Sequence, residues 1–147
     1  MLGRFVTGVT VATACADDTF VGVTANSFTS VSLDPPLVLF CVHNDAHVCG
    51  PLQQAGAFAI NILGADQAHV SRQFAGARVD RFAGVPVREG VTASPILRDA
   101  LAYLECHIAG VMSGGDHLII LGAVCDLGVQ RDDRPLTFYR GDYGRLA

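Results

Sequence analysis

The sequence predicts a mainly β domain with two short helices, in which antiparallel strands close into a barrel. Short apolar runs rich in Val, Ile, Phe and Thr recur along the chain, and turn residues separate most of them. Strands and helices do not alternate regularly, and no glycine fingerprint follows the first strand, which argues against a Rossmann domain. An antiparallel barrel with peripheral helices therefore fits best.

About seven strands are expected, most of them joined as hairpins. The first two form a hairpin because the first is β-branched and roughly alternating, and the turn residues Ala16 to Thr19 follow it. The third is an unbroken apolar run, which predicts burial on both faces. The expected strands, in chain order, span residues 4–14, 20–25, 37–42, 57–63, 101–111, 117–129 and 135–139.

Two short helices are expected in the first half of the chain. The first spans residues 49–55 and ends at Gly56, a residue typical of the position after a helix. The second spans residues 66–75 with Asp66 as its candidate N-cap. Residues 76–98 contain scattered Gly and Pro and are expected to be irregular.

Length and composition predict a single domain, residues 1–147. Half of the residues are hydrophobic and only 16% are charged, so we expect a second subunit to cover an apolar face. No apolar run approaches the ~20 residues of a membrane-spanning helix, and no secretion signal begins the chain. Scattered Arg residues and a net charge of −4 argue against nucleic-acid binding. Five Cys without a CxxC pair predict free thiols in a reducing cytoplasm.

The most informative stretch is residues 22–40, which predicts a strand, a polar loop and a second strand. The loop is crowded with short hydroxyl and amide side chains, including Asn26, Ser27 and Ser30. Such side chains can satisfy the backbone of their own loop. They and the loop N–H groups can equally bind a polar ligand. Both interpretations remain open at this point.

Three further patterns carry residue types with chemical potential. Cys41, His43, His47 and Cys49 are all metal-ligand types, but their spacing matches no usual zinc pattern, so no metal is expected. His117 follows a Gly-Gly-Asp turn, where an imidazole can contact a cofactor or pass a proton, or simply lie exposed. Residues 140–143 combine Arg140 and Tyr143, which suits a planar anionic ligand or a plain C-terminal tail.

With these residues in view, the chain resembles the flavin reductase-like domain family, the small reductase components of two-component flavin monooxygenases. The resemblance covers essentially the whole chain in the family's order. Four motifs carry it: FVTGVTVAT at 5–13, GVTANSFTSVSLDPPLVLF at 22–40, GGDHLIILGAV at 114–124 and PLTFYRGDYGRL at 135–146.

The resemblance implies a split β-barrel homodimer that binds FMN or FAD near the subunit interface. The loop would lie against the flavin ring, where backbone N–H groups stabilise the charge that the reduced ring gains. The segment after the third strand would hold the flavin phosphate, assisted by a downstream Arg-Phe pair. The implied cofactor-binding residues are Thr24, Ala25, Asn26, Ser27, Phe28, Ser30, Asn44, Ala46, His47, Arg81, Phe82, Arg140 and Tyr143.

The phosphate segment departs from the family pattern. Ala46 and Val48 lack the hydroxyl groups that relatives tend to carry there, and Asp45 adds a charge that repels phosphate. His47 and Asn44 would have to compensate.

The implied activity is NAD(P)H:flavin oxidoreduction by direct hydride transfer, with NADH or NADPH as donor and reduced flavin passing to a partner monooxygenase. His117 is the candidate catalytic residue, and it and Tyr143 match positions that meet the nicotinamide nucleotide. Two alternatives remain open: a flavin- or haem-binding split-barrel protein without reductase activity, and a metal-binding protein that uses the Cys/His cluster.

Overall fold

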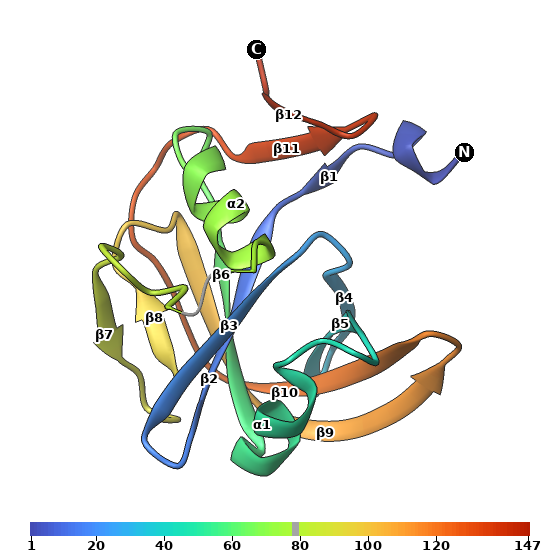
Figure 1. Cartoon of the computed structure of the whole chain (residues 1–147), viewed down its shortest axis with the longest axis vertical. Helices are drawn as coiled ribbons and strands as arrows, with labels where there is room; N and C mark the ends of the chain where they lie inside the picture. The colour runs from blue at the N-terminus through green and yellow to red at the C-terminus, as the bar shows by residue number, and fades with distance from the viewer. Residues whose placement is uncertain (78–79) are drawn as a thin grey trace.

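A seven-stranded antiparallel sheet forms the body of the protein (Figure 1). The computed structural model describes residues 1–77 and 80–147. Every strand pair in the sheet is antiparallel, which confirms the predicted mainly β class. Its strands, in spatial order, are β3 (Thr19–Ala25), β2 (Thr10–Ala16), β6 (Ala57–Ile62), β9 (Ala102–Gly114), β10 (His117–Val129), β5 (Pro36–His43) and β4 (Thr29–Leu33).

The sheet curls until its two ends meet. β3 and β4 lie at opposite ends of the strand order, yet only residues 26–28 separate them in sequence. Within this connection, Ser27 Oγ accepts a hydrogen bond from Cys41 N–H and donates one to Cys41 C=O, both at 2.9 Å. The Ser27 side chain thus bonds the backbone of β5 at a position where a neighbouring strand would otherwise pair with it. We call this pair of bonds the Ser27 closure.

Smaller elements cover the barrel. In Figure 1, helices α1 (Cys49–Ala55) and α2 (Ala68–Ala75) lie at opposite ends of the barrel: α1 packs on β2 and β6, and α2 packs on β3 and β2. Among the described residues, no helix has the length and apolar character needed to cross a bilayer. The smaller elements are the 3-10 helix η1 (Leu2–Arg4), α1 (Cys49–Ala55), α2 (Ala68–Ala75), the three-stranded sheet of β1 (Thr7–Gly8), β11 (Leu136–Tyr139) and β12 (Asp142–Arg145), and the hairpin of β7 (Val87–Glu89) and β8 (Pro95–Leu97).

Strand β2 lies between two apolar cores, and its alternation assigns its side chains to them. Ala12 and Ala14 enter the barrel core, which also contains the edge-to-face pair Phe40 and Phe58. Val9, just before the strand, and Val11 enter a second core beneath α2. The predicted two-faced pattern of this strand is confirmed, and both faces are buried.

Three predictions about the strands and the loop between them need correction. The first strand, expected at residues 4–14, is interrupted: η1 and β1 precede β2, and Val9 separates β1 from β2. β5 was expected to be buried on both faces, but its burial alternates because one face lies outside the barrel core. The polar loop after β3 is shorter than expected, since residues 29–33 pair with β5 as an edge strand.

The region expected to be irregular contains the β7–β8 hairpin, with Thr13 and Glu105 tying this region to the barrel. Glu105 is fully buried, and its carboxylate accepts bonds from Val91 N–H (3.0 Å), Thr92 N–H (2.9 Å) and the Thr92 hydroxyl (2.6 Å). Thr13 Oγ1 donates to Pro95 C=O at 2.6 Å. Long-range polar contacts therefore order a segment that lacks a local pattern. The final short strand was also predicted without its partner, β12.

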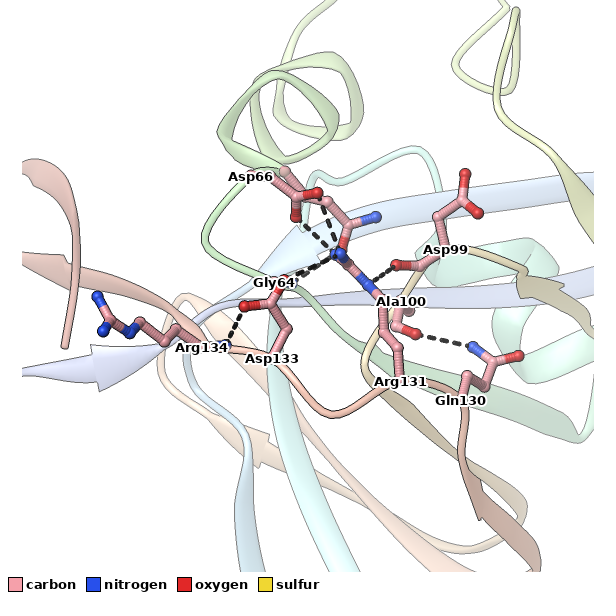
Figure 2. Close-up of polar contacts among 9 residues, drawn as sticks. Gly64, Asp66, Asp99, Ala100, Gln130, Arg131, Asp133 and Arg134 are labelled. Carbon is pink, nitrogen blue, oxygen red and sulfur yellow. Dashed lines mark hydrogen bonds and ion pairs between the residues drawn. The ribbon is translucent and has the colours of Figure 1, made fainter.

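The candidate cap Asp66 has a different role. The second helix begins at Ala68, and Gln67 is its N-cap. The Asp66 carboxylate instead pairs with both terminal nitrogens of Arg131 (Figure 2). Arg131 Nε also donates to Asp99 C=O at 2.8 Å. Arg131 lies in the connection between β10 and β11, so its side chain links this connection to the segments that contain Asp66 and Asp99.

Candidate functional site

The side chains of the loop after β3 serve the fold. Thr24 Oγ1 donates to Ser71 C=O on α2 at 2.6 Å, and Ser27 makes the closure. Ala25 is buried at the end of β3, and Phe28 packs against the barrel core. Ser30 lies exposed on β4. Of the two interpretations left open for the hydroxyl groups, satisfaction of the protein's own backbone holds for Thr24 and Ser27.

The backbone N–H groups of the same loop, unlike two of its hydroxyl groups, are not bonded to any described residue. Within the described residues, the N–H groups of Asn26, Ser27 and Phe28 have no hydrogen-bond acceptor. These residues border a groove of about 490 Å³, whose wall also includes Phe5 and Thr7. Thr7 Oγ1 is buried and has no hydrogen-bond partner in the described part of the chain. A buried hydroxyl without a partner is rare in folded proteins, and together with these loop N–H groups it fits a ligand with hydrogen-bonding atoms.

Tyr143 extends the groove toward α2. Its hydroxyl lies 2.7 Å from Ser71 Oγ, and its ring packs beside Phe138 with centroids 5.4 Å apart. Together with Thr24 and Asn26 these residues line an adjoining cavity of about 220 Å³. The structure thus brings Tyr143 beside the loop.

Arg140 is placed elsewhere. Its guanidinium lies over the Tyr139 ring, 5.3 Å from the centroid, and the backbone N–H of Arg140 donates to Gly3 C=O. The side chain is exposed and lines none of the cavities beside the loop.

A second pocket, of about 450 Å³, lies further back along β3. We call it the basic pocket; it is lined by Thr19, Phe20, Val21, Gly22, His47, Ala77, Asp80, Arg81 and Phe82. Arg81 Nη1 donates to Gly22 C=O (3.2 Å) and to Phe74 C=O (2.5 Å), which fixes the guanidinium at the pocket wall.

The two basic side chains of this pocket influence each other. Burial lowers the pKa of Arg81. Burial also lowers the pKa of His47, and the positive charge of Arg81 lowers it further, while the Gly22 backbone acts in the opposite direction. A bound anion would favour both protonated forms. This pocket is therefore suited to a phosphate group, with Asp80 the one acidic residue among those that line it.

Gly22 is needed at this position because two aromatic rings pack over its Cα. A Cβ there would lie 2.8 Å from the Phe74 ring and 3.3 Å from the Phe82 ring. Phe82 stacks edge-to-face on Phe74, with centroids 4.9 Å apart, and tilts against Phe20 at 5.7 Å. From Gly22 to Asn26 the chain advances four residues, about 13 Å in extended conformation, which separates the basic pocket from the groove.

The third cluster lies where β5 ends and β10 begins. We call it the histidine corner, and it comprises His43, Asn44, Asp116 and His117. His43 and His117 are direct register partners. Asn44 N–H donates to Asp116 C=O at 2.9 Å, and Asn44 Nδ2 donates to Gly115 C=O at 3.1 Å.

The predicted phosphate segment is thus divided between two clusters. Asn44 belongs to the histidine corner, and only His47 reaches the basic pocket. Ala46 forms the turn between them: its N–H donates to His43 C=O, and its methyl group packs on the barrel core.

The Cys/His cluster is divided in the same way. Cys41 bonds Ser27 through its backbone, and Cys49 Sγ donates to His43 C=O at 3.0 Å. The ring of His43 faces His117, whereas His47 lines the basic pocket. Residues 1–77 and 80–147 contain no group of three or more His, Cys, Asp or Glu side chains arranged for a metal ion.

Sequence reasoning missed several residues of these clusters. Ser71 gave one usable signal, since a small hydroxyl residue on the apolar side of a helix needs a partner once buried. Gly22 stands in a strand, where glycine often marks a close approach of another group. Thr7 and Phe20 gave no local signal, because only the tertiary fold brings them to the groove and the basic pocket.

Comparison with known proteins identifies the family. The model of the family described as "Flavin reductase like domain" matches residues 2–147. The chain belongs to this family. Flavin reductase-like relatives include reductase subunit HsaB of a flavin-dependent monooxygenase from Mycobacterium tuberculosis, 43% identical over 97% of this chain and 78% of the relative.

Two solved flavin reductase-like structures share the fold closely. Component B of a nitrilotriacetate monooxygenase from Mycobacterium thermoresistibile has a TM-score of 0.96 and 40% identity, over 99% of this chain and 83% of that chain. The NADH:FAD oxidoreductase of Streptomyces globisporus, solved with NAD and FAD fragments, has a TM-score of 0.94 and 41% identity, over 99% of this chain and 88% of that chain.

Proposed function

We propose that this chain, as a single domain spanning residues 1–147, is an NAD(P)H:flavin oxidoreductase that reduces FMN or FAD and supplies the reduced flavin to a partner monooxygenase. The family assignment supports the reaction class. The observation on which the placement rests is the row of three N–H groups, Asn26 to Phe28, that have no acceptor within the described residues.

The groove would hold the flavin ring, and the basic pocket would hold the flavin phosphate. The row of N–H groups faces the polar edge of the ring, where fixed donors stabilise negative charge as it develops. His47 and Arg81 hold the phosphate. When bound, flavin supplies the chemistry by accepting a hydride at N5 from C4 of the nicotinamide.

The protein contributes alignment rather than a nucleophile. His117 and Tyr143 are the residues that would contact the nicotinamide nucleotide and align it for transfer. The hydroxyl pair of Tyr143 and Ser71 fixes the position of the tyrosine ring. Water is excluded by Phe5 and Phe28, the apolar walls of the groove.

The active form is a homodimer, which the apolar surface of the single chain supports. Leu33 on β4 is 93% exposed and Val129 on β10 is 81% exposed, more than a solvated strand face usually carries. The reduced flavin passes to the oxygenase by transient contact or diffusion. All five cysteines, which lie in the described part of the chain, are free thiols, and this supports a reducing cytoplasm as the location.

Steady-state oxidation of NADH tests the function. We expect the purified protein to oxidise NADH, measured as a loss of absorbance at 340 nm, only when FMN or FAD is added. The assay should cover both flavins and both nucleotides, because the family assignment does not select among them. If no pair gives flavin-dependent turnover while the protein remains folded, the proposal is wrong.

A histidine substitution tests the assigned site. His117→Ala should raise the KM for NADH more than the Kd for flavin, because the imidazole meets the nucleotide and not the flavin. His107→Ala is the matched control, since His107 lies exposed in the middle of β9, where it pairs with Ala57 and Ala123. Equal effects of His117→Ala on both ligands would contradict the assigned role.

A further inference from the structure

The histidine corner contains a second imidazole that the proposed function does not use. The rings of His43 and His117 pack edge-to-face, with centroids 5.2 Å apart and an interplanar angle of 71°. Both rings are partly exposed, and their residues are paired across β5 and β10. Aromatic rings in this arrangement attract each other beyond the area they bury.

Each ring is also fixed through its Nδ1 atom. His117 Nδ1 lies 2.7 Å from Asp116 Oδ1, a geometry in which the neutral imidazole carries its proton on Nδ1 and donates it. Asp45 N–H donates to His43 Nδ1 at 3.1 Å, so the neutral His43 carries its proton on Nε2. The two rings therefore adopt opposite tautomers, and the Nε2 atom of His117 remains available as an acceptor.

The backbone beneath the rings is held just as firmly. The two hydrogen bonds from Asn44 join the turn after β5 to the turn before β10. Asp45 and Asp116 are the acidic groups beside the pair, and Asp45 Oδ2 lies 3.9 Å from His43 Nδ1. A free imidazole at the start of a strand would sample several rotamers, whereas this one is restricted on two sides.

We propose that His43 is a positioning residue, which holds the His117 ring in the orientation that bonds Asp116 and meets the nicotinamide nucleotide. The kinetic part of this inference rests on the proposed function. His43 itself need not touch the nucleotide: without its ring, His117 populates other rotamers, and the apparent affinity falls in proportion to the competent fraction.

Kinetics of substituted proteins test the proposal. An edge-to-face pair of this kind corresponds to about a two- to tenfold effect. His43→Ala should therefore raise the KM for NADH about fivefold, with kcat and the flavin Kd changed less than about twofold. His43→Phe keeps an aromatic ring and should restore most of the affinity. A KM that is unchanged in His43→Ala, or that Phe does not restore, would overturn the proposal.

A double-substitution cycle separates positioning from direct contact. In a His117→Ala background, His43→Ala should have almost no further effect on the KM for NADH, because the residue it positions is gone. Additive effects would mean that His43 acts on the nucleotide by itself.

Histidine NMR tests the geometry without any enzyme assay. In ¹⁵N-labelled flavin-free protein at neutral to mildly alkaline pH, His117 should show the Nδ1–H tautomer, and His43→Ala should convert it to a mixture. Unchanged His117 ring signals would overturn the positioning role. If the NMR result holds while no flavin-dependent NADH oxidation is found, the proposed function fails and the positioning role stands.

Discussion

Ser27→Ala separates the structural role of the loop side chains from the ligand role of the loop backbone. The Ser27 hydroxyl makes two hydrogen bonds to Cys41, both at 2.9 Å, and both are lost in the alanine variant. Each such bond contributes about 0.5–1.5 kcal/mol net, and the Cys41 backbone groups are left without this partner. We expect the free energy of unfolding to fall by about 2 kcal/mol.

For a chain of 147 residues that loss corresponds to a decrease in Tm of roughly 4–8 °C. Thermal unfolding of the flavin-free protein, followed by circular dichroism, measures it. Ser30→Ala is the matched control, because Ser30 is exposed on the neighbouring strand and should change Tm by less than about 2 °C.

The same pair of variants addresses binding. Below the transition temperature, flavin affinity in Ser27→Ala should stay within about tenfold of the parent, since the proposed donors are backbone N–H groups and one lost hydrogen bond is worth about a factor of ten at most. The reasoning fails if Ser27→Ala is as stable as Ser30→Ala, or if it abolishes flavin binding while its Tm is unchanged.

Three further predictions concern titratable or charged side chains. Because the pKa of His47 is lowered in the folded protein, the unfolded chain binds more protons, and stability should decrease as pH falls through about 6.5. Urea titrations at pH 7.5 and 5.5 measure this decrease in the free energy of unfolding, and it should be smaller in His47→Gln. Glu105→Ala leaves two N–H groups and a hydroxyl without their buried acceptor and should cost about 3 kcal/mol or more in urea unfolding. Arg131→Lys cannot reproduce the two-nitrogen contact with Asp66 and should cost about 1 kcal/mol in the same measurement (Figure 2).

The first two have a matched control, and each of the three has an outcome that contradicts it. His69→Gln, at an exposed position on α2, should leave the pH dependence unchanged, and an equal effect of the two histidine variants would refute the first prediction. A Glu89→Ala variant alters an exposed acid of β7 and should stay near parental stability; parity with Glu105→Ala would refute the second. Additive losses for Arg131→Lys and Asp66→Asn would show that the two side chains do not act as a pair.

The sequence predicts the elements whose pattern is local. β2, β3 and β10 alternate or form long apolar runs, and α1 ends at a glycine with φ of 68°. β7 and β8 are each three residues long, too short for any period to be visible, and the buried carboxylate of Glu105 anchors the loop between them. Contacts between residues that are distant in sequence produce no pattern in the local sequence from which they could be predicted.

The candidate site shows the same division. Resemblance selects the residue types, but the turn at Ala46 reverses the chain, so that Asn44 and His47 enter different clusters although three positions apart. The stack of His43 on His117 depends on the register of β5 and β10, which a single sequence does not reveal. Arg140 illustrates the converse: it is only three positions from Tyr143 in sequence, yet its guanidinium lies over the ring of Tyr139.

In residues 26–28 the Ser27 hydroxyl bonds the protein itself, whereas the three backbone N–H groups have no acceptor among the described residues, and this has a consequence for mutagenesis. Recognition through main-chain atoms is insensitive to which side chains are attached, so alanine scanning of this turn would find a stability element and overlook the ligand. Only a change to the peptide unit itself would reveal it: Phe28→Pro, which deletes an N–H that no described residue accepts, removes a donor that no ordinary substitution touches.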